Sequence, residues 1–332
     1  MLQDNAASLS AVGVVIIGRN EGNRLRDCLS SGIRESLHIL YVDSGSSDDS
    51  VQLARSMGID AIELDPLTPF SAARARNEGF RRLLQTHSGL NYVQFIDGDC
   101  ELQPGWLSIA MGFLADHADI AVVSGRLREK IVAKSIYNTL CDIEWDVPAG
   151  PAKECGGIAM MRASAFERAE GFRIDLIAGE EPELCVRLRG QGWKIWRLDR
   201  EMALHDAAMS RFSQWWKRTI RSGHAIAQGA ALHGAPPEKY GIRESRSILL
   251  WGFTIPLIAL GLIPLIGPRA LLVLALYPLQ VARLALAGAR SARENWISAI
   301  FLVIGKFPAM LGLLQYHIRS TCGQQGRLIE HK

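Results

Sequence analysis

The chain has 332 residues and a formal net charge of +3. Hydrophobic residues make up 48% and charged residues 21%, a balance that excludes an intrinsically disordered chain. This net charge is too small to indicate nucleic-acid binding. The basic residues also form no long tract and instead cluster near an apolar C-terminal region. Contact with a membrane surface explains them better. The six cysteines include no Cys-x-x-Cys pair, so we expect a reduced soluble part that faces the cytosol.

Strands and helices are expected to alternate through the first hundred residues. Apolar runs rich in β-branched residues predict buried strands at 11–17, 39–42, 61–64 and 92–96. The segments at 24–31, 51–57 and 71–84 are expected to be helical. Such alternation predicts an α/β fold with a parallel sheet, whose ligands bind across the carboxyl ends of the strands.

The fourth predicted strand leads into an acidic turn, Asp97-Gly98-Asp99. Gly98 allows the backbone to bend sharply, so that two carboxylates can face one cavity. Carboxylates at a strand end suit Mg²⁺ or Mn²⁺ shared with a substrate diphosphate. A solvated turn that binds nothing is the alternative.

Two other kinds of phosphate site are excluded by the sequence. The loop Gly18–Gly22 after the first strand lacks the Gly-x-Gly-x-x-Gly pattern of dinucleotide-binding domains, and no Walker-type Gly-Lys-Ser/Thr loop occurs. A phosphate would therefore have to be held by a metal ion and side chains.

A series of motifs in this order resembles family 2 glycosyltransferases with the GT-A fold. The motifs are Val14–Glu21, Val42–Asp48, Ala75–Gly79, Phe95–Asp99, Gly156-Gly157, Gly171-Phe172, Gly179–Leu184, Arg187-Leu188 and Gly192-Trp193. The resemblance covers residues 11–225 and implies a GT-A-type, mostly parallel sheet flanked by helices.

The resemblance also implies roles for individual residues in binding and transfer of a sugar from a nucleotide diphosphate. The residues expected to ligate Mg²⁺ or Mn²⁺ are Asp99, Asp97 and His205, although a lone histidine is more often structural. The residues expected to bind the nucleotide sugar are Asn20, Glu21, Asp43, Arg76, Asp97 and Arg218.

Glu180 and Glu181 stand where the family usually has Glu-Asp. Glu181 occupies the Asp position, so we expect it to be the general base for the acceptor hydroxyl, with Glu180 as its acidic neighbour. The longer side chain leaves the choice between the two open. Repulsion between adjacent carboxylates can raise one pKa. The alternative is that the two glutamates have no catalytic role and only stabilise the start of a helix before Pro182, where negative charge is favourable.

The C-terminal third is expected to be a helical membrane region. From Arg211, aromatic and basic residues predict a helix in a membrane interface, with Trp215 and Trp216 at headgroup level and Arg218 near phosphates. This segment lacks the Gln-x-x-Arg-Trp motif of polymerising synthases, and its absence favours addition of single sugars. Three spans are expected at 248–266, 270–288 and 296–315, with two spans or a soluble helical domain as alternatives.

These features predict a membrane-bound, inverting and non-processive glycosyltransferase. The expected domains are a cytoplasmic GT-A domain at 1–225, a juxtamembrane segment at 226–247 and a membrane region at 248–332. Arginines before the first span and between the second and third predict a multi-pass protein of the inner or plasma membrane whose catalytic domain is cytoplasmic. The expected donor is a UDP-sugar and the expected acceptor a lipid-linked or cell-envelope polysaccharide, without nucleic acid. A non-catalytic scaffold in polysaccharide assembly and a nucleotidyltransferase are the alternatives.

Overall fold

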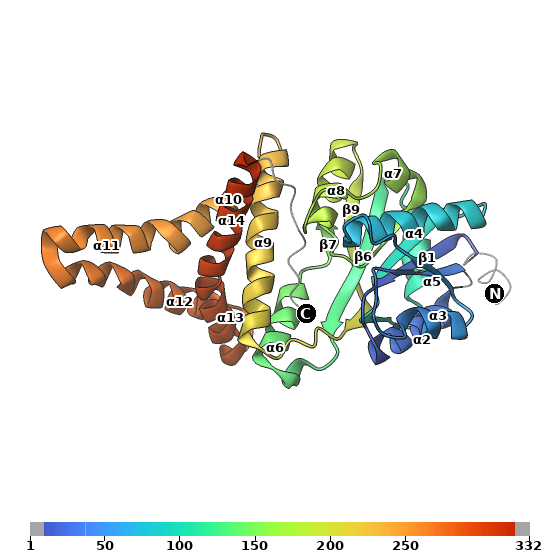
Figure 1. The fold of residues 1–332 in the computed structure, drawn as a ribbon, viewed down its shortest axis with the longest axis horizontal. Coiled ribbons are helices and arrows are strands. Elements are labelled where there is room, and N and C mark those ends of the chain that lie inside the picture. The colour runs from blue at the N-terminus through green and yellow to red at the C-terminus, as the bar shows by residue number, and fades with distance from the viewer. Residues whose placement is uncertain (1–9, 37, 323–332) are drawn as a thin grey trace. The chain divides into compact units, whose positions relative to one another are not determined.

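The computed structural model describes residues 10–36 and 38–322, which form two compact units (Figure 1). The first unit comprises 10–131 without residue 37, together with Glu144–Ile174 and Glu180–Ala207. The second comprises Val132–Ile143, Asp175–Gly179 and 208–322. The helix that begins at Phe212 thus belongs to the unit that holds the C-terminal helices. The domain limits expected at residues 225 and 247 stay predictions.

Within the described residues, the first unit is built on one nine-stranded sheet of order β3-β2-β1-β4-β8-β6-β9-β5, with β7 paired to β9. The strands are β1 Val12–Gly18, β2 His38–Asp43, β3 Asp60–Glu63, β4 Tyr92–Asp97, β5 Cys100–Leu102, β6 Ile120–Glu129, β7 Gly150–Ala152, β8 Ala159–Arg162 and β9 Lys194–His205. The first four are parallel neighbours, as the alternation of elements predicts. Strand β8 runs antiparallel between β4 and β6, so the other half of the sheet is mixed.

Helices cover both faces of this sheet. They are α2 Asn23–Glu35, α3 Ser50–Ser56, α4 Ala72–Thr86, α5 Trp106–Asp116, α7 Ala163–Arg168 and α8 Glu180–Gly190. Successive side chains of a strand point to opposite faces. Val14 and Ile16 of β1 therefore join one core cluster with α2 and α5, whereas Val15 and Ile17 join another with α4, α7 and α8.

The register of the sheet brings polar strand ends to one edge. Gly18 at the end of β1 pairs with Asp43 at the end of β2, and Ile17 pairs with Asp97 at the end of β4. Strand β9 extends as far as His205 and pairs with β5, β6 and β7. This extension places His205 opposite Cys100 and Glu129.

The second unit is helical. Its elements are η1 Val132–Lys134, most of α6 Ile136–Trp145, α9 Phe212–His233, α10 Ile242–Leu249, the π-helical η2 Leu250–Thr254, α11 Ile255–Ile266, the 3₁₀-helical η3 Gly267–Ala275, α12 Leu276–Ala287, α13 Ala292–Ile304 and α14 Lys306–Thr321. In the described part of the chain, two segments are long and apolar enough to cross a membrane, Ile242–Ala287 and Ala292–Thr321. The first encloses the first predicted span and all but the last residue of the second, and the second segment encloses the third span.

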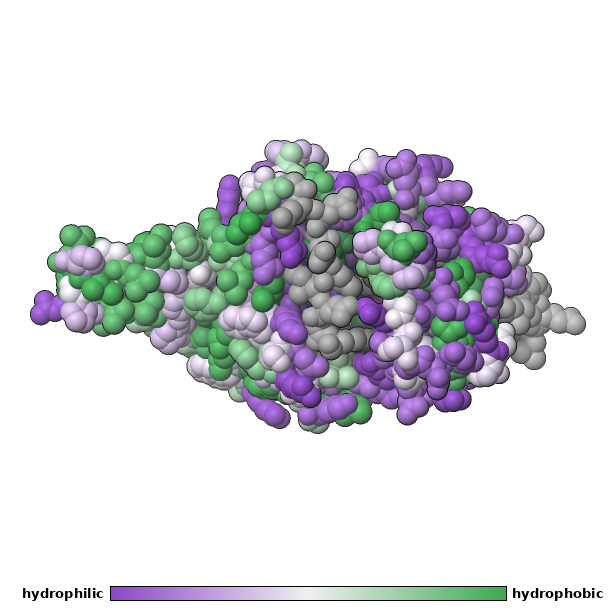
Figure 2. Space-filling view, in the orientation of Figure 1, coloured by the Kyte–Doolittle hydropathy of each residue, from purple (hydrophilic) through white to green (hydrophobic). Residues whose placement is uncertain are grey.

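The first apolar segment folds back on itself. Gly267 has a φ of +66°, which ends α11, and Figure 1 shows α11 and α12 as the two legs of a hairpin. Only 17% of the most apolar stretch of this segment is buried within the chain. Figure 2 shows hydrophobic residues spread over the surface of these legs. An apolar surface of this extent is typical of a segment that contacts a membrane or another protein.

The second apolar segment is partly covered, because its helix α14 packs against α9. A Cβ on Gly312 of α14 would lie 2.0 Å from the carbonyl oxygen of Ile220, and one on Gly223 of α9 would lie 2.1 Å from that of Ala309. The two glycines thus let the backbones approach closely. Trp215 is buried, with its ring 4.8 Å from that of Phe301 in α13. This indole therefore packs inside the helical unit, and its position at headgroup level stays a prediction.

Candidate active site

Two loops at the edge of the sheet are joined through Asn20. This residue adopts a φ of +56°, and its side-chain Oδ1 accepts a hydrogen bond of 2.7 Å from the Ser47 backbone N–H. Its own N–H donates to Ser46 Oγ over 2.9 Å. Asparagine tolerates the left-handed conformation better than most residues. The loops that follow β1 and β2 are therefore held together by a residue predicted to bind the nucleotide.

Asp43 at the end of β2 is buried and already accepts hydrogen bonds at both carboxylate oxygens. The Tyr41 hydroxyl donates to Oδ1 over 2.8 Å, and the Ser46 hydroxyl donates to the same oxygen over 2.5 Å. The backbone N–H groups of Gly45 and Ser46 donate to Oδ2 over 2.9 and 2.7 Å. Since a carboxylate offers about four acceptor positions, these four hydrogen bonds satisfy Asp43, which organises this loop.

A buried arginine connects Asp97 with Glu180. Arg76 on α4 donates from Nη2 to Asp97 Oδ1 over 2.7 Å and from Nη1 to Glu180 Oε1 over 2.8 Å. Burial alone would lower the pKa of Arg76, but the two carboxylates outweigh it and raise that pKa. Gly79, one turn further along the helix, lets α4 approach the sheet, since a Cβ there would lie 2.4 Å from Val15. The predicted residues Arg76, Asp97 and Glu180 thus form one cluster.

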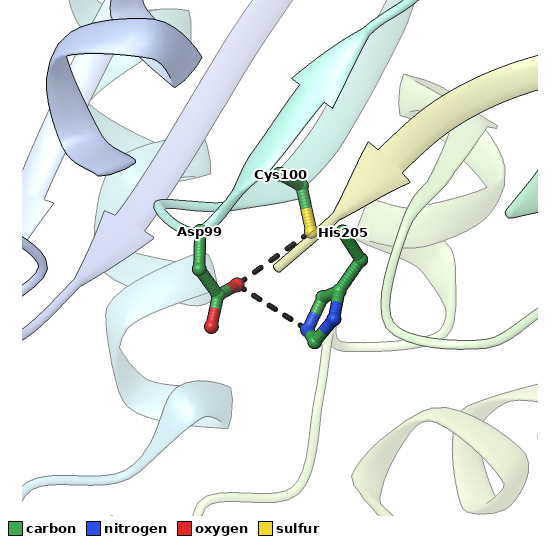
Figure 3. Close-up of side chains that lie close together, drawn as sticks. All are labelled: Asp99, Cys100 and His205. Carbon is green, nitrogen blue, oxygen red and sulfur yellow. Dashed lines mark hydrogen bonds and ion pairs between the residues drawn. The ribbon is translucent and has the colours of Figure 1, made fainter. Parts of the chain in front are cut away.

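Asp99 and His205 face each other beside this cluster (Figure 3). Asp99 Oδ1 lies 3.4 Å from His205 Nε2 and 3.6 Å from the Cys100 thiol. The other imidazole nitrogen, Nδ1, lies 3.7 Å from Glu129 Oε2. Burial would lower the pKa of His205, but the carboxylates of Asp99 and Glu129 outweigh it and raise that pKa. The predicted ligands Asp99 and His205 therefore lie within reach of one shared cation.

Glu21 joins the same edge through an arginine that we did not predict. Arg24 Nη2 lies 2.7 Å from Glu21 Oε2, and Arg24 Nη1 lies 4.0 Å from Asp99 Oδ2. The spacing of three residues at the start of a helix is a signal that could have indicated the first pair. Glu129 gives no such local signal, because the pairing of β6 with β9 brings it to His205.

The two adjacent glutamates at the start of α8 point to different surroundings. Glu180 bonds to Arg76, whereas Glu181 is buried against two cysteines. Its Oε1 accepts hydrogen bonds from the Cys155 N–H at 2.6 Å, the Cys155 thiol at 3.0 Å and the Cys185 thiol at 2.9 Å. Burial raises the pKa of Glu181. The cysteine contacts were not predicted, since neither residue belongs to a motif.

Arg218 lies on α9 in the second unit, and its role stays a prediction.

The arrangement of the sheet, with an acidic strand end beside a histidine, defines a GT-A-type domain. Residues 13–168 match the model of glycosyl transferase family 2. Over 238 residues, the chain is 26% identical to the pre-mycofactocin glycosyltransferase of Mycobacterium tuberculosis, a match that covers 67% of this chain and 48% of that protein. The chain thus spans about half the length of this relative.

Two solved structures share the fold over most of the chain. The mannosyltransferase PcManGT from Pyrobaculum calidifontis, in complex with GDP-Man and Mn²⁺, aligns with a TM-score of 0.55 and 19% identity over 94% of this chain and 87% of its own. The TarS 1–349 structure from S. aureus aligns with a TM-score of 0.51 and 12% identity over 94% of this chain and 92% of its own. The predicted GT-A fold is confirmed.

Proposed function

We propose that this chain is a membrane-bound, metal-dependent glycosyltransferase that moves a single sugar from a nucleotide diphosphate to an acceptor, with inversion. The observation that carries the proposal is the cluster at the carboxyl ends of β4 and β9. There Asp97 and Asp99 stand beside Arg76, Glu180 and His205. Carboxylates gathered beside an imidazole are a donor set that a divalent cation can use, so such a site favours turnover over a scaffold.

The residues of this cluster suit a hard divalent cation. Asp99 supplies carboxylate oxygens, and His205 directs Nε2 toward Asp99 while Glu129 lies behind its Nδ1. A carboxylate behind an imidazole fixes the tautomer that leaves the other nitrogen free to ligate. Asp99 and His205, with Asp97 close by, would hold Mg²⁺ or Mn²⁺. The ion would supply positive charge for the departing diphosphate.

The chain's own residues supply the remaining functions. Asn20, Glu21 and Asp43 support the loops against which a nucleotide, for which we favour uridine, would bind. Glu181 takes the proton of the acceptor hydroxyl, whose oxygen attacks the anomeric carbon as the bond to the diphosphate breaks. Its raised pKa brings this carboxyl closer to the range in which a general base works best. Glu180 is neutralised by Arg76 and helps to hold that guanidinium toward the donor.

The apolar hairpin supports attachment to a membrane. We propose an inner or plasma membrane with the glycosyltransferase domain in the cytoplasm, because arginines lie before the first predicted span and between the second and third. Its two legs expose leucine and isoleucine side chains, among them Leu257, Leu260 and Leu279. A sugar acceptor carried by a lipid would be delivered to such a protein at the membrane surface. We therefore propose a lipid-linked or cell-envelope polysaccharide acceptor.

The test is sugar transfer by the full chain, purified in detergent, with Mn²⁺ or Mg²⁺ and a panel of UDP-, GDP- and dTDP-sugars. Asp99→Ala and Glu181→Gln should both lose transfer, and exposed controls Asp60→Ala and Glu63→Gln should keep it. Only Asp99→Ala should also weaken metal-dependent donor binding.

The other outcomes separate the alternatives. If no sugar were transferred from any donor, and no nucleotide bound in a metal-dependent way, a non-catalytic scaffold would be favoured. Release of a sugar 1-phosphate, with transfer of the nucleoside monophosphate to the acceptor, would indicate a nucleotidyltransferase. Transfer to water-soluble acceptors alone would remove the lipid-linked acceptor from the proposal.

A further inference from the structure

The carboxylate of Glu181 is held in an asymmetric way. Three donors converge on Oε1, namely the Cys155 N–H and the thiols of Cys155 and Cys185. The other oxygen, Oε2, accepts no hydrogen bond from the described residues, and it is not among the fully buried polar atoms without a partner. One oxygen is thus fixed by the protein, and the other can receive a proton.

The two cysteines approach Glu181 from different elements. Cys185 lies one turn further along α8, whereas Cys155 precedes β8 and stands next to Gly156. Both are fully buried and free, and their sulfur atoms lie 3.8 Å apart. Burial raises the pKa of Cys155 to about 12 and raises that of Cys185 as well. Both sulfurs therefore carry protons and serve as hydrogen-bond donors.

We propose that Cys155 and Cys185 are positioning residues for the general base: they hold Oε1 of Glu181 and leave Oε2 to take the proton of the acceptor hydroxyl. The inference rests on the proposed function. It also accounts for a glutamate where the family usually has aspartate, because the longer side chain reaches a clamp on two separate elements. Neither cysteine touches the acceptor, so each acts through Glu181.

The charges around Glu181 set the direction of the expected pH effect. Burial raises the pKa of Glu181, the hydrogen bonds from the two cysteines lower it, and the nearby carboxylate of Glu154 raises it. The Arg197 guanidinium lies near enough to interact with both Glu181 and Cys155. Replacing the thiols by methyl groups removes two donors to the ionised form, so the pKa of Glu181 must rise further.

The experiment compares pH profiles of kcat/KM for the full chain in detergent, between about pH 5 and 9. A base must be ionised to act, so Cys155→Ala/Cys185→Ala should move the acidic limb upward by about one pH unit, since hydrogen bonds to a charged group have this order of strength. At a given pH on the acidic limb, the activity should fall about tenfold, as a shift of one pH unit requires, with the donor KM unchanged. Cys155→Ser/Cys185→Ser retains both donors and should restore the limb to within a few tenths of the wild-type value.

The outcomes distinguish this inference from the proposed function. If the wild type transferred no sugar, both would fall together. An active Cys155→Ala/Cys185→Ala variant whose profile superimposed on the wild type would overturn the inference alone. If that variant did not fold, the decision would pass to Cys185→Ala and the serine variant. Equal profiles for all three proteins would refute the clamp, and a limb that moves only with alanine would support it.

Discussion

Removal of the guanidinium at position 76 should destabilise the first unit through the two carboxylates that it leaves behind. Arg76 is 3% exposed and bonds to both Asp97 and Glu180. Methionine fills much of the same volume but supplies no charge, so Arg76→Met leaves two negative charges without a partner. Breaking a buried ion pair on one side costs about 3–5 kcal/mol.

The lower end of that range applies here, because the Asp97 side chain is 34% exposed and water can compensate part of the loss. We therefore expect a decrease of about 3 kcal/mol in the free energy of unfolding. For a domain of this size, 1 kcal/mol corresponds to about 2–4 °C in Tm, which gives a decrease of about 6–12 °C. Thermal unfolding followed by tryptophan fluorescence in detergent measures it.

A second substitution makes the reasoning specific. Adding Glu180→Gln to Arg76→Met removes one orphaned charge and should recover about 1–2 kcal/mol, although the same change in the wild type should destabilise. The charge argument is refuted if Arg76→Met melts within 2 °C of the wild type, about the resolution of such a shift, or if the double variant melts below the single one.

Three further outcomes follow from other contacts. Gly312→Ala should lower the stability of the helical unit by at least about 1–3 kcal/mol, because its Cβ would meet a backbone carbonyl, whereas Gly261→Ala, with nothing within 4 Å, should be neutral or slightly stabilising in the same melting assay. His205→Ala should weaken Mn²⁺ binding by about 10-fold or more in calorimetric titration, and unchanged affinity would remove His205 from the metal site. In the wild type, Mn²⁺ affinity should fall as pH decreases through the raised pKa of His205, since only the neutral imidazole ligates, and this dependence should be smaller in His205→Ala.

Much of the first unit could be predicted because its signals are local. The strands at 12–18 and 92–97 are unbroken apolar runs, and the Asp97-Gly98-Asp99 turn follows the second of them directly. Their shared edge follows from parallel pairing alone. Family resemblance carried the prediction to Arg76 and His205, which no periodicity would have singled out.

The remaining features depend on contacts between distant residues. The antiparallel insertion of β8 between β4 and β6 has no sequence signature, and neither has the pairing of β6 with β9 that brings Glu129 to His205. The separation of Glu180 from Glu181 depends on side-chain packing around Cys155 and Cys185. In the same way, a hydrophobic count cannot tell a lipid-facing helix from one such as α14, which packs against α9.

The contact between Gly223 and Gly312 has a consequence for the order of events during synthesis. Helix α9 leaves the ribosome well before α14, and the whole apolar hairpin is made between them. The face of α9 that packs against α14 therefore stays without this partner until α14 has been translated. Because a backbone-to-backbone fit admits no larger side chain in its place, this face of α9 can be covered only after α14 has been made. A chain interrupted within the hairpin would therefore leave α9 without this partner.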